Sequence, residues 1–380
     1  MDWIKLLDQI DNIVWGPPLL FLLVGTGVYL SVRLGFIQIF RLPQALKLIF
    51  TAKNDGSGDI DSFGALCTAL AATVGTGNII GVATAIKAGG PGALFWMWLA
   101  AFFGMATKYG EGVLAIKYRS KDANGNVAGG PMHYILKGMG EKFRPLAVFF
   151  AIGGVLVALL GIGTFPQVNA IVSGINNSFG VSAAVSGIIL TAIVALVVIG
   201  GLQSISNVSS KVIPFMSILY VGICVVVLIG SYKELPKAIS LVMSGAFTGT
   251  AAIGGFMGAT IQMAIRNGIA RGVFSNESGL GSAPIAAAAA KTKWPAEQGL
   301  ISMTGTFIDT IIICTLTGLS IILTGTWKSN LEGAELTGAA FGSVMPVLGP
   351  VLLTLSLMLF AFTTIIGWNY YGERCCEFLF

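Results

Sequence analysis

Long apolar stretches recur along the chain, separated by charged residues or by Gly-Pro turns. A helix needs about 20 predominantly apolar residues to cross the hydrocarbon core of a bilayer. Nine stretches meet this condition, and they are Ile13–Val32, Ser62–Ala88, Gly92–Ala115, Pro145–Val172, Val181–Gly200, Val208–Gly230, Thr250–Ile269, Gln298–Thr324 and Val344–Tyr371. The pattern predicts an all-α integral membrane protein with about nine spans.

Composition supports the membrane assignment and narrows the function. Hydrophobic residues make up 55% of the chain and charged residues 10%, whereas soluble domains carry about 25% charged residues. The only histidine, His133, lies in a Gly-Pro loop, and the five cysteines show no metal-like spacing. We therefore expect no cofactor and, because HExxH and Gly-x-Ser-x-Gly motifs are absent from the sequence, no enzyme.

The distribution of basic residues predicts the orientation. With the amino terminus outside, 16 of the 22 Lys and Arg residues fall in cytoplasmic loops and five in outer loops. Basic residues favour the cytoplasmic side of a membrane, so this orientation in the cell membrane is expected. The net charge of +5 then reflects a lipid surface, and no nucleic acid or obligatory protein partner is indicated.

The second stretch holds the run Ala71-Ala72-Thr73-Val74-Gly75-Thr76-Gly77-Asn78 near its midpoint. Glycine and asparagine disfavour regular helix, and a helix that opens at membrane depth exposes N–H groups to an anion and carbonyls to a cation. The alternative is a glycine packing face, which Gly77 and Gly81 would fit.

Three further positions place polar groups at membrane depth. Gln167 follows a proline in the fourth stretch and can bind both ends of a zwitterion, or stabilise a kink. Asp309 lies midway along the eighth stretch, where an acid is costly and usually functional. It could join Asn78 in a second cation site, relay a proton, or pair with Lys108. Lys108 could instead pair with Glu111.

Several segments resemble the alanine or glycine:cation symporter family, also called sodium:alanine symporters. They are Gly89-Gly90-Pro91-Gly92-Ala93-Leu94-Phe95-Trp96, the run Ala71–Gly81, Phe103–Tyr109, Gly129-Gly130-Pro131-Met132, Arg271–Pro284 and Ser302–Thr310. The resemblance implies a leucine-transporter-like fold of two inverted five-helix repeats after one extra helix. Residues 1–60 would hold the extra helix, 61–231 the first repeat and 232–380 the second. That fold has eleven spans, so we expect the last two to be missing here.

The resemblance also implies site residues. The expected substrate contacts are Thr73, Gly75, Thr76, Gly77, Asn78, Phe165, Gln167, Gln262, Asn276 and Trp368. Sodium would lie between the carbonyls of Ala71 and Val74 and the hydroxyls of Thr363 and Thr364, although threonines in membrane helices also bond ordinarily to a carbonyl one turn earlier. Around the expected break at 276–282, Ser275 and Glu277 could serve the substrate helix or an inner gate.

The expected function is secondary symport, in which a sodium gradient drives uptake of alanine or glycine by alternating access. Proton coupling through Asp309 or Glu277 is the alternative within this class. A channel is the remaining class, but it would normally require a polar filter assembled around a pore.

Overall fold

The computed structural model of the chain describes residues 3–53, 55–122, 125–248 and 260–380. Nearly all of its regular structure is helical. The α-helices are α1 (Trp3–Val14), α2 (Pro17–Arg33), α3 (Ile37–Phe40), α4 (Leu42–Thr51), α5 (Ser62–Thr73), α6 (Val82–Gly89), α7 (Ala93–Lys117), α8 (Pro131–Met139), α9 (Arg144–Leu160), α10 (Phe165–Phe179), α11 (Ala183–Val198), α12 (Gly201–Gly230), α13 (Leu235–Thr248), α14 (Ile261–Asn276), α15 (Ala283–Ala287), α16 (Pro295–Thr306), α17 (Thr315–Leu323), α18 (Gly333–Val344) and α19 (Leu348–Leu379).

Shorter elements connect these helices. Two are π-helical, η1 (Gly77–Gly81) and η5 (Phe307–Cys314), and three are 3₁₀ turns, η2 (Glu141–Phe143), η3 (Tyr232–Glu234) and η6 (Thr326–Lys328). One antiparallel hairpin joins β1 (Ser120–Lys121) to β2 (Val127–Ala128), with Ser120 opposite Ala128.

Several helices are suited to a bilayer. By length and apolar composition, four in the described part of the chain could cross one: Glu141–Asn177, Gly201–Gly230, Pro295–Leu323 and Leu348–Leu379. The bent pair Ser62–Thr73 and Gly77–Gly89 would make a fifth, and Pro17–Arg33 and Ala183–Val198 are shorter apolar helices. The chain is thus an all-α membrane protein, and the count of nine spans stays a prediction.

Some predicted boundaries were wrong. The first span begins at Pro17 rather than Ile13, because a turn at Trp15 and Gly16 separates α1 from α2. α14 continues to Asn276 rather than ending at Ile269, while the first ten residues of that predicted span, 250–259, lie outside the described residues. The basic residues of α14 interrupt the apolar pattern but do not end the helix, because Arg is a good helix former.

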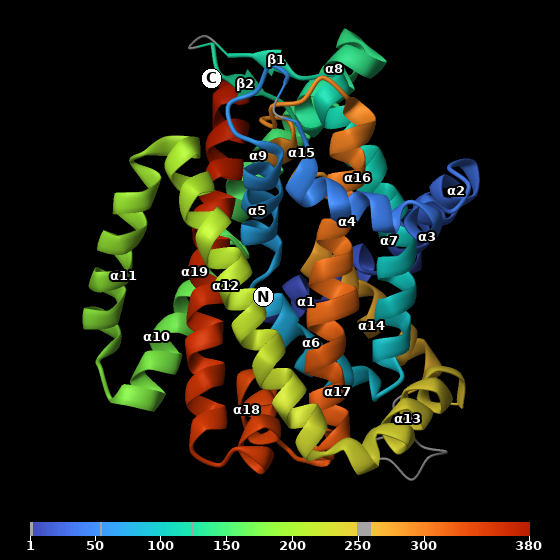
Figure 1. Cartoon of the computed structure of the whole chain (residues 1–380), viewed down its shortest axis with the longest axis vertical. Coiled ribbons are helices and arrows are strands. Elements are labelled where there is room, and N and C mark those ends of the chain that lie inside the picture. Colours follow the sequence, from blue (N-terminus) through green and yellow to red (C-terminus); the bar gives the residue numbers. More distant parts are fainter. Residues whose placement is uncertain (1–2, 54, 123–124, 249–259) are drawn as a thin grey trace.

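The bent pair formed by α5 and by η1 with α6 lies near the centre of the bundle. Figure 1 shows α12 and α19 running side by side along the long axis, and α5 packs against both of them as well as against α15. α7 packs against α16 and α14 on the other side. The hairpin, α8 and the end of α19 gather at one end of the molecule, and α13 and α18 lie at the other (Figure 1).

Candidate functional site

The helix that begins at Ser62 is interrupted near its middle. α5 ends at Thr73, Val74 turns to ψ 93°, and π-helical η1 starts at Gly77. The two halves meet at 53°. The Gly75 N–H donates to Asn78 Oδ1 (2.9 Å), and the Asn78 N–H donates to Gly75 O (3.2 Å). The predicted break is therefore present, but the Gly75 N–H already has the Asn78 side chain as its acceptor.

Gln167 lies over this break. It comes from the first turn of α10, which follows the non-helical residues 161–164. Its Nε2 donates to Thr76 Oγ1 (3.1 Å) and to Ile162 O (3.1 Å). Its Oε1 is buried without a partner among the described residues, and it lies 3.6 Å from where a Cβ on Gly75 would be. A buried acceptor left unpaired is costly, so this oxygen is suited to a donor such as an ammonium group.

α19 touches the break from another side. A Cβ on Gly75 would lie 2.3 Å from Thr364 Oγ1, and one on Gly367 would lie 2.7 Å from Ala72 N. The two helices therefore approach so closely that only glycine fits at both positions. Thr364 and its neighbour Thr363 are both buried.

The two threonine hydroxyls make the ordinary bonds of a membrane helix. Thr364 Oγ1 donates to Phe360 O (2.9 Å), and Thr363 Oγ1 donates to Leu359 O (3.1 Å) and Phe360 O (3.0 Å). A hydroxyl that donates keeps two lone pairs. Both threonines can therefore accept a cation without losing these bonds, and Ala71 and Val74 are likewise buried.

Asp309 lies on η5 and is joined to the same polar region through Asn78. Asn78 Nδ2 donates to Asp309 Oδ1 (2.7 Å) and to its main-chain O (3.2 Å). Ser275 Oγ (2.9 Å) and Thr310 Oγ1 (2.6 Å) donate to Asp309 Oδ2. Asn78 thus connects the break in the first interrupted helix to a fully buried carboxylate. The donors that meet this carboxylate are neutral, and π-helical turns such as η1 and η5 occur frequently at functional sites.

The pairs considered for Lys108 do not form. Lys108 Nζ donates to Asn276 O at the end of α14 (2.9 Å), and Glu111 Oε1 accepts from the Gly281 N–H (3.0 Å). Within the described residues, no ion pair closer than 4.0 Å joins Lys108 to Asp309 or to Glu111. Both side chains instead satisfy backbone groups that a second helix interruption leaves open.

This second interruption separates α14 from α15. Glu277 is left-handed (φ 55°), as are Gly279 (φ 88°) and Gly281 (φ 81°). The Asn276 side chain holds the turn, because its Oδ1 accepts from the Ser278 N–H (2.9 Å) and its Nδ2 donates to Thr310 Oγ1 (3.0 Å). The break expected at 276–282 is present, and Asn276 is engaged in building it.

The remaining candidates are scattered. Thr73 is buried and its hydroxyl donates to Ala69 O (3.2 Å). Phe165 is 60% exposed, and Gln262 is exposed in the first turn of α14, about 20 Å along the helix from Asn276. Trp368 packs on Gly163 and against Tyr371, and its Nε1 is buried without a partner among the described residues.

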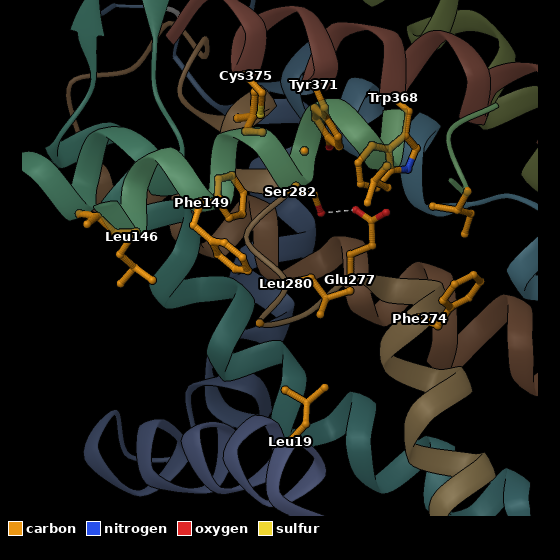
Figure 2. A pocket seen from close by; sticks show the side chains of 18 residues that line it. Leu19, Leu146, Phe149, Phe274, Glu277, Leu280, Ser282, Trp368, Tyr371 and Cys375 are labelled. Carbon is orange, nitrogen blue, oxygen red and sulfur yellow. Dashed lines mark hydrogen bonds between the residues drawn. The ribbon is translucent and has the colours of Figure 1, made fainter. Parts of the chain in front are cut away.

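A cavity of about 870 Å³ lies between α9, α19 and the turn from α14 to α15. Figure 2 shows Phe149, Leu146 and Leu280 around it, with Glu277 and Ser282 pointing toward one another. The Ser282 hydroxyl donates to the Glu277 carboxylate. Trp368 is the one predicted substrate residue that lines it. The cavity is mostly apolar, and Gly75, Asn78 and Asp309 do not line it.

Sequence reasoning missed several members of this cluster. Thr310 follows Asp309 directly, so its position beside a buried acid could have indicated it. Cys314 lies 3.3 Å from Asn78 Nδ2 and 3.4 Å from Ser275 Oγ. Nothing in its sequence surroundings distinguishes this cysteine from a buried apolar residue.

Interrupted helices around buried polar groups are typical of the substrate and ion sites of membrane transporters. The chain matches the sodium:alanine symporter family over residues 1–380. It therefore belongs to that family, whose members carry amino acids together with a cation.

Individual relatives agree with the family match. An uncharacterised transporter of Haemophilus influenzae is 56% identical over 377 residues, which are 99% of this chain and 82% of the relative. The sodium/alanine symporter AgcS of Methanococcus maripaludis is 48% identical over 387 residues, covering 100% of this chain and 84% of AgcS. A probable sodium/glutamine symporter of Bacillus subtilis, GlnT, is 36% identical over 97% of this chain and 76% of its own length.

Proposed function

We propose that this protein couples sodium influx to the uptake of a small amino acid, alanine or glycine, across the cell membrane. The observation that carries the proposal is the unpartnered Gln167 Oε1 facing Gly75, inside a helix break that Thr364 also touches. A buried acceptor, freed main chain and threonine hydroxyls together suit a zwitterion and a small hard cation. The family match and the sodium/alanine symporter AgcS support this choice of substrate and ion.

The substrate would lie against the first break. Its ammonium would donate to Gln167 Oε1, and its carboxylate would be held by the N–H groups of Thr76 and Gly77. Thr73, Asn78, Asn276 and Trp368 would surround it. Little space is available beside Gly75, because a Cβ there would lie 2.3 Å from Thr364 Oγ1. We leave Phe165 and Gln262 out of the pocket, because both are exposed away from it.

Two cation sites follow from the same contacts. The first would join the carbonyls of Ala71 and Val74 to the hydroxyls of Thr363 and Thr364. Hard oxygen ligands of this kind fit sodium. The second would lie at Asp309, where a cation would offset a carboxylate that has neutral donors around it. Asn78 would serve it as a ligand through Oδ1, because its Nδ2 is a donor to Asp309 Oδ1.

The architecture proposed for this activity is leucine-transporter-like. Residues 61–231 would form the first inverted repeat and residues 232–380 the second, after an extra helix in residues 1–60. Support comes from the two interruptions, since each proposed repeat contains one helix that is broken near a buried polar cluster. In the proposed orientation the amino terminus is outside, and the end with β1, β2 and α8 faces the cytoplasm.

Proton coupling is the second candidate. Asp309 and Glu277 are both buried carboxyl groups close to the breaks, and either could carry a proton between the two sides. One relative of Bacillus subtilis, 38% identical, is described as a putative sodium/proton-dependent alanine carrier protein. Such a carrier would lose its driving force when the proton gradient is removed.

Uptake of radiolabelled alanine into proteoliposomes distinguishes these candidates. We expect uptake with an imposed sodium gradient and little with a proton gradient alone. Replacing both ligands in Thr363→Val/Thr364→Val should raise the sodium concentration for half-maximal uptake by about tenfold or more, since each lost ligand bond is worth about 1 kcal/mol.

A matched control is Thr191→Val. Thr191 donates to Gly187 O (2.8 Å) in the same way but is exposed on α11, so its sodium dependence should match that of the parent. An alanine uptake rate that does not depend on the sodium gradient would exclude the proposal of sodium coupling. An unchanged sodium dependence in the double variant would exclude Thr363 and Thr364 as ligands.

A further inference from the structure

Two chain segments meet at the end of the molecule that carries β1, β2 and α8 (Figure 1). One is residues 56–60, which lead into α5, and the other is residues 288–292, which follow α15. Ile60 and Ala290 form a parallel β-bridge. The Asp59 N–H donates to Ala289 O (2.8 Å), and the Lys291 N–H donates to Ile60 O (2.8 Å). The main chains of the two segments are therefore directly bonded.

Arg119, which lies two residues after the end of α7, bonds to both of these segments. Its Nη1 donates to Ala288 O (3.0 Å) and Ala290 O (2.7 Å). Its Nη2 donates to Thr292 O (2.9 Å) and to Ser57 Oγ (3.0 Å). Arginine presents its donors in a planar fork, which lysine cannot replace. The guanidinium thus joins three parts of the chain, and we call Arg119 with residues 56–60 and 288–292 the latch.

The latch connects parts of the two interrupted helices and therefore limits how they can move relative to each other. α5 is one half of the first interrupted helix, and α15 follows the second interruption. α7, which ends two residues before Arg119, also holds the second interruption through Lys108 and Glu111. A separate outward swing of α5 would break the main-chain bonds between residues 56–60 and 288–292 together with the bond from Arg119 to Ser57. Movement of α5, α7 and α15 as one body would break none of them.

We propose that the latch keeps α5 and α15 together throughout the transport cycle, with Arg119 as the positioning residue that holds it closed. Opening toward this end of the molecule then occurs between this unit and the helices around it, such as α9 and α19. This inference rests on the proposed transport function for its activity measurements. Its first test needs no transport.

The first test is a disulfide between Ile60→Cys and Ala290→Cys. Neighbouring strands lie about 4.8 Å apart, within the Cα separation of about 4.4–6.8 Å that a disulfide spans. The background carries Cys376→Ser, because the other four native cysteines are buried. Disulfide formation in membranes is stopped at successive times with acid, and it is measured as the loss of two of the thiols that react with maleimide once the protein has been denatured, because Ile60 and Ala290 are buried. We expect equally fast formation without ligand, with sodium, and with sodium plus alanine.

Slower formation in any of these conditions would overturn the proposal, because it would show that the segments separate. In proteoliposomes, the oxidised protein should transport within twofold of its reduced form. The control pair Ser120→Cys/Ala128→Cys, across the hairpin, reports any effect of oxidation itself. Loss of uptake on oxidation that reductant restores, without the same loss in the control, would also overturn the proposal.

The second test concerns Arg119. Arg119→Gln should lower the uptake rate at least fivefold with substrate KM within twofold, because the latch lies away from the substrate pocket. Oxidised Ile60→Cys/Ala290→Cys should restore Arg119→Gln to within twofold of the parent, a rescue that a merely misfolded variant would not show. Uptake that remains slow after oxidation, or an Arg119→Gln variant as fast as the parent, would refute the role of Arg119. A parent without uptake would refute the proposed function, while the disulfide rates would still decide the latch.

Discussion

Gly75→Ala is the substitution whose effect the structure defines most sharply. The added Cβ would lie 2.3 Å from Thr364 Oγ1 and 3.4 Å from Thr364 Cβ. Gly75 is not among the positive-φ residues, so alanine is allowed there by the backbone and the effect isolates the contact. Threonine is restricted at χ1, and turning its hydroxyl away would break the bond to Phe360 O.

The expected magnitude follows from this clash. Forcing an extra methyl into a packed interior costs about 1–3 kcal/mol, and displacing Thr364 would also remove a proposed sodium ligand. We therefore expect a lower melting temperature in detergent and roughly a tenfold increase in the sodium concentration for half-maximal alanine uptake, since 1.4 kcal/mol corresponds to a factor of ten.

Gly81→Ala is the matched control, because it lies in the same interrupted helix and a Cβ there meets nothing within 4 Å. It should leave both measurements near the parent values. Adding Thr364→Ser to Gly75→Ala removes a methyl and frees the hydroxyl to rotate, so part of the lost stability should return. If Gly75→Ala matched Gly81→Ala in melting temperature and sodium dependence, the close approach of α5 to α19 would be refuted.

Two further predictions concern stability. Lys108→Met leaves the buried Asn276 carbonyl without its donor and should lower the free energy of unfolding by about 1–3 kcal/mol. The control Lys117→Met, at the exposed end of the same helix, should change it by less than about 0.5 kcal/mol. Equal melting temperatures of the two variants would contradict this prediction. Burial, then Lys137 and Arg374, lower the pKa of His133 to about 4 from its usual 6.5. Between pH 6.5 and 4 the His133 side chain is protonated in the unfolded chain but neutral in the native state. The free energy of unfolding should therefore fall as the pH drops from about 6.5 to 4. His133→Gln should flatten this part of the melting-temperature profile, and an unchanged slope would exclude His133 as a source.

The first break could be read from the sequence because its cause is local. Glycine, threonine and asparagine at the middle of an apolar stretch weaken the helix wherever it packs. The second break followed in the same way from Asn276 and the glycines after it. The number of long helices was harder to judge, since α13 lies in a stretch of mixed polarity and α14 continues past its basic residues.

The hydrogen-bond partners of the buried charged side chains could not be predicted from the sequence, because those partners lie on elements far away along the chain. Lys108 and Glu111 are three apart on one helix and could have paired with each other, yet they bond to main-chain groups near residues 276 and 281. Phe165 faces outward because the chain turns between α9 and α10, which sets the direction of the following helix. Such directions come from tertiary packing rather than from residue type.

The bonds between residues 56–60 and 288–292 are made almost wholly by main-chain atoms. Side chains there matter mainly through their bulk: a Cβ on Gly56 would lie 2.2 Å from the Thr292 carbonyl carbon, and one on Gly58 would lie 2.5 Å from that of Ala290. Ala288, Ala289 and Ala290 are fully buried as well, so larger side chains should be excluded there too. In a saturation mutagenesis screen, these three positions with Gly56 and Gly58 should therefore accept only small residues, a pattern that marks a contact defined by shape. Arg119 is the exception, because no other side chain offers its planar set of donors.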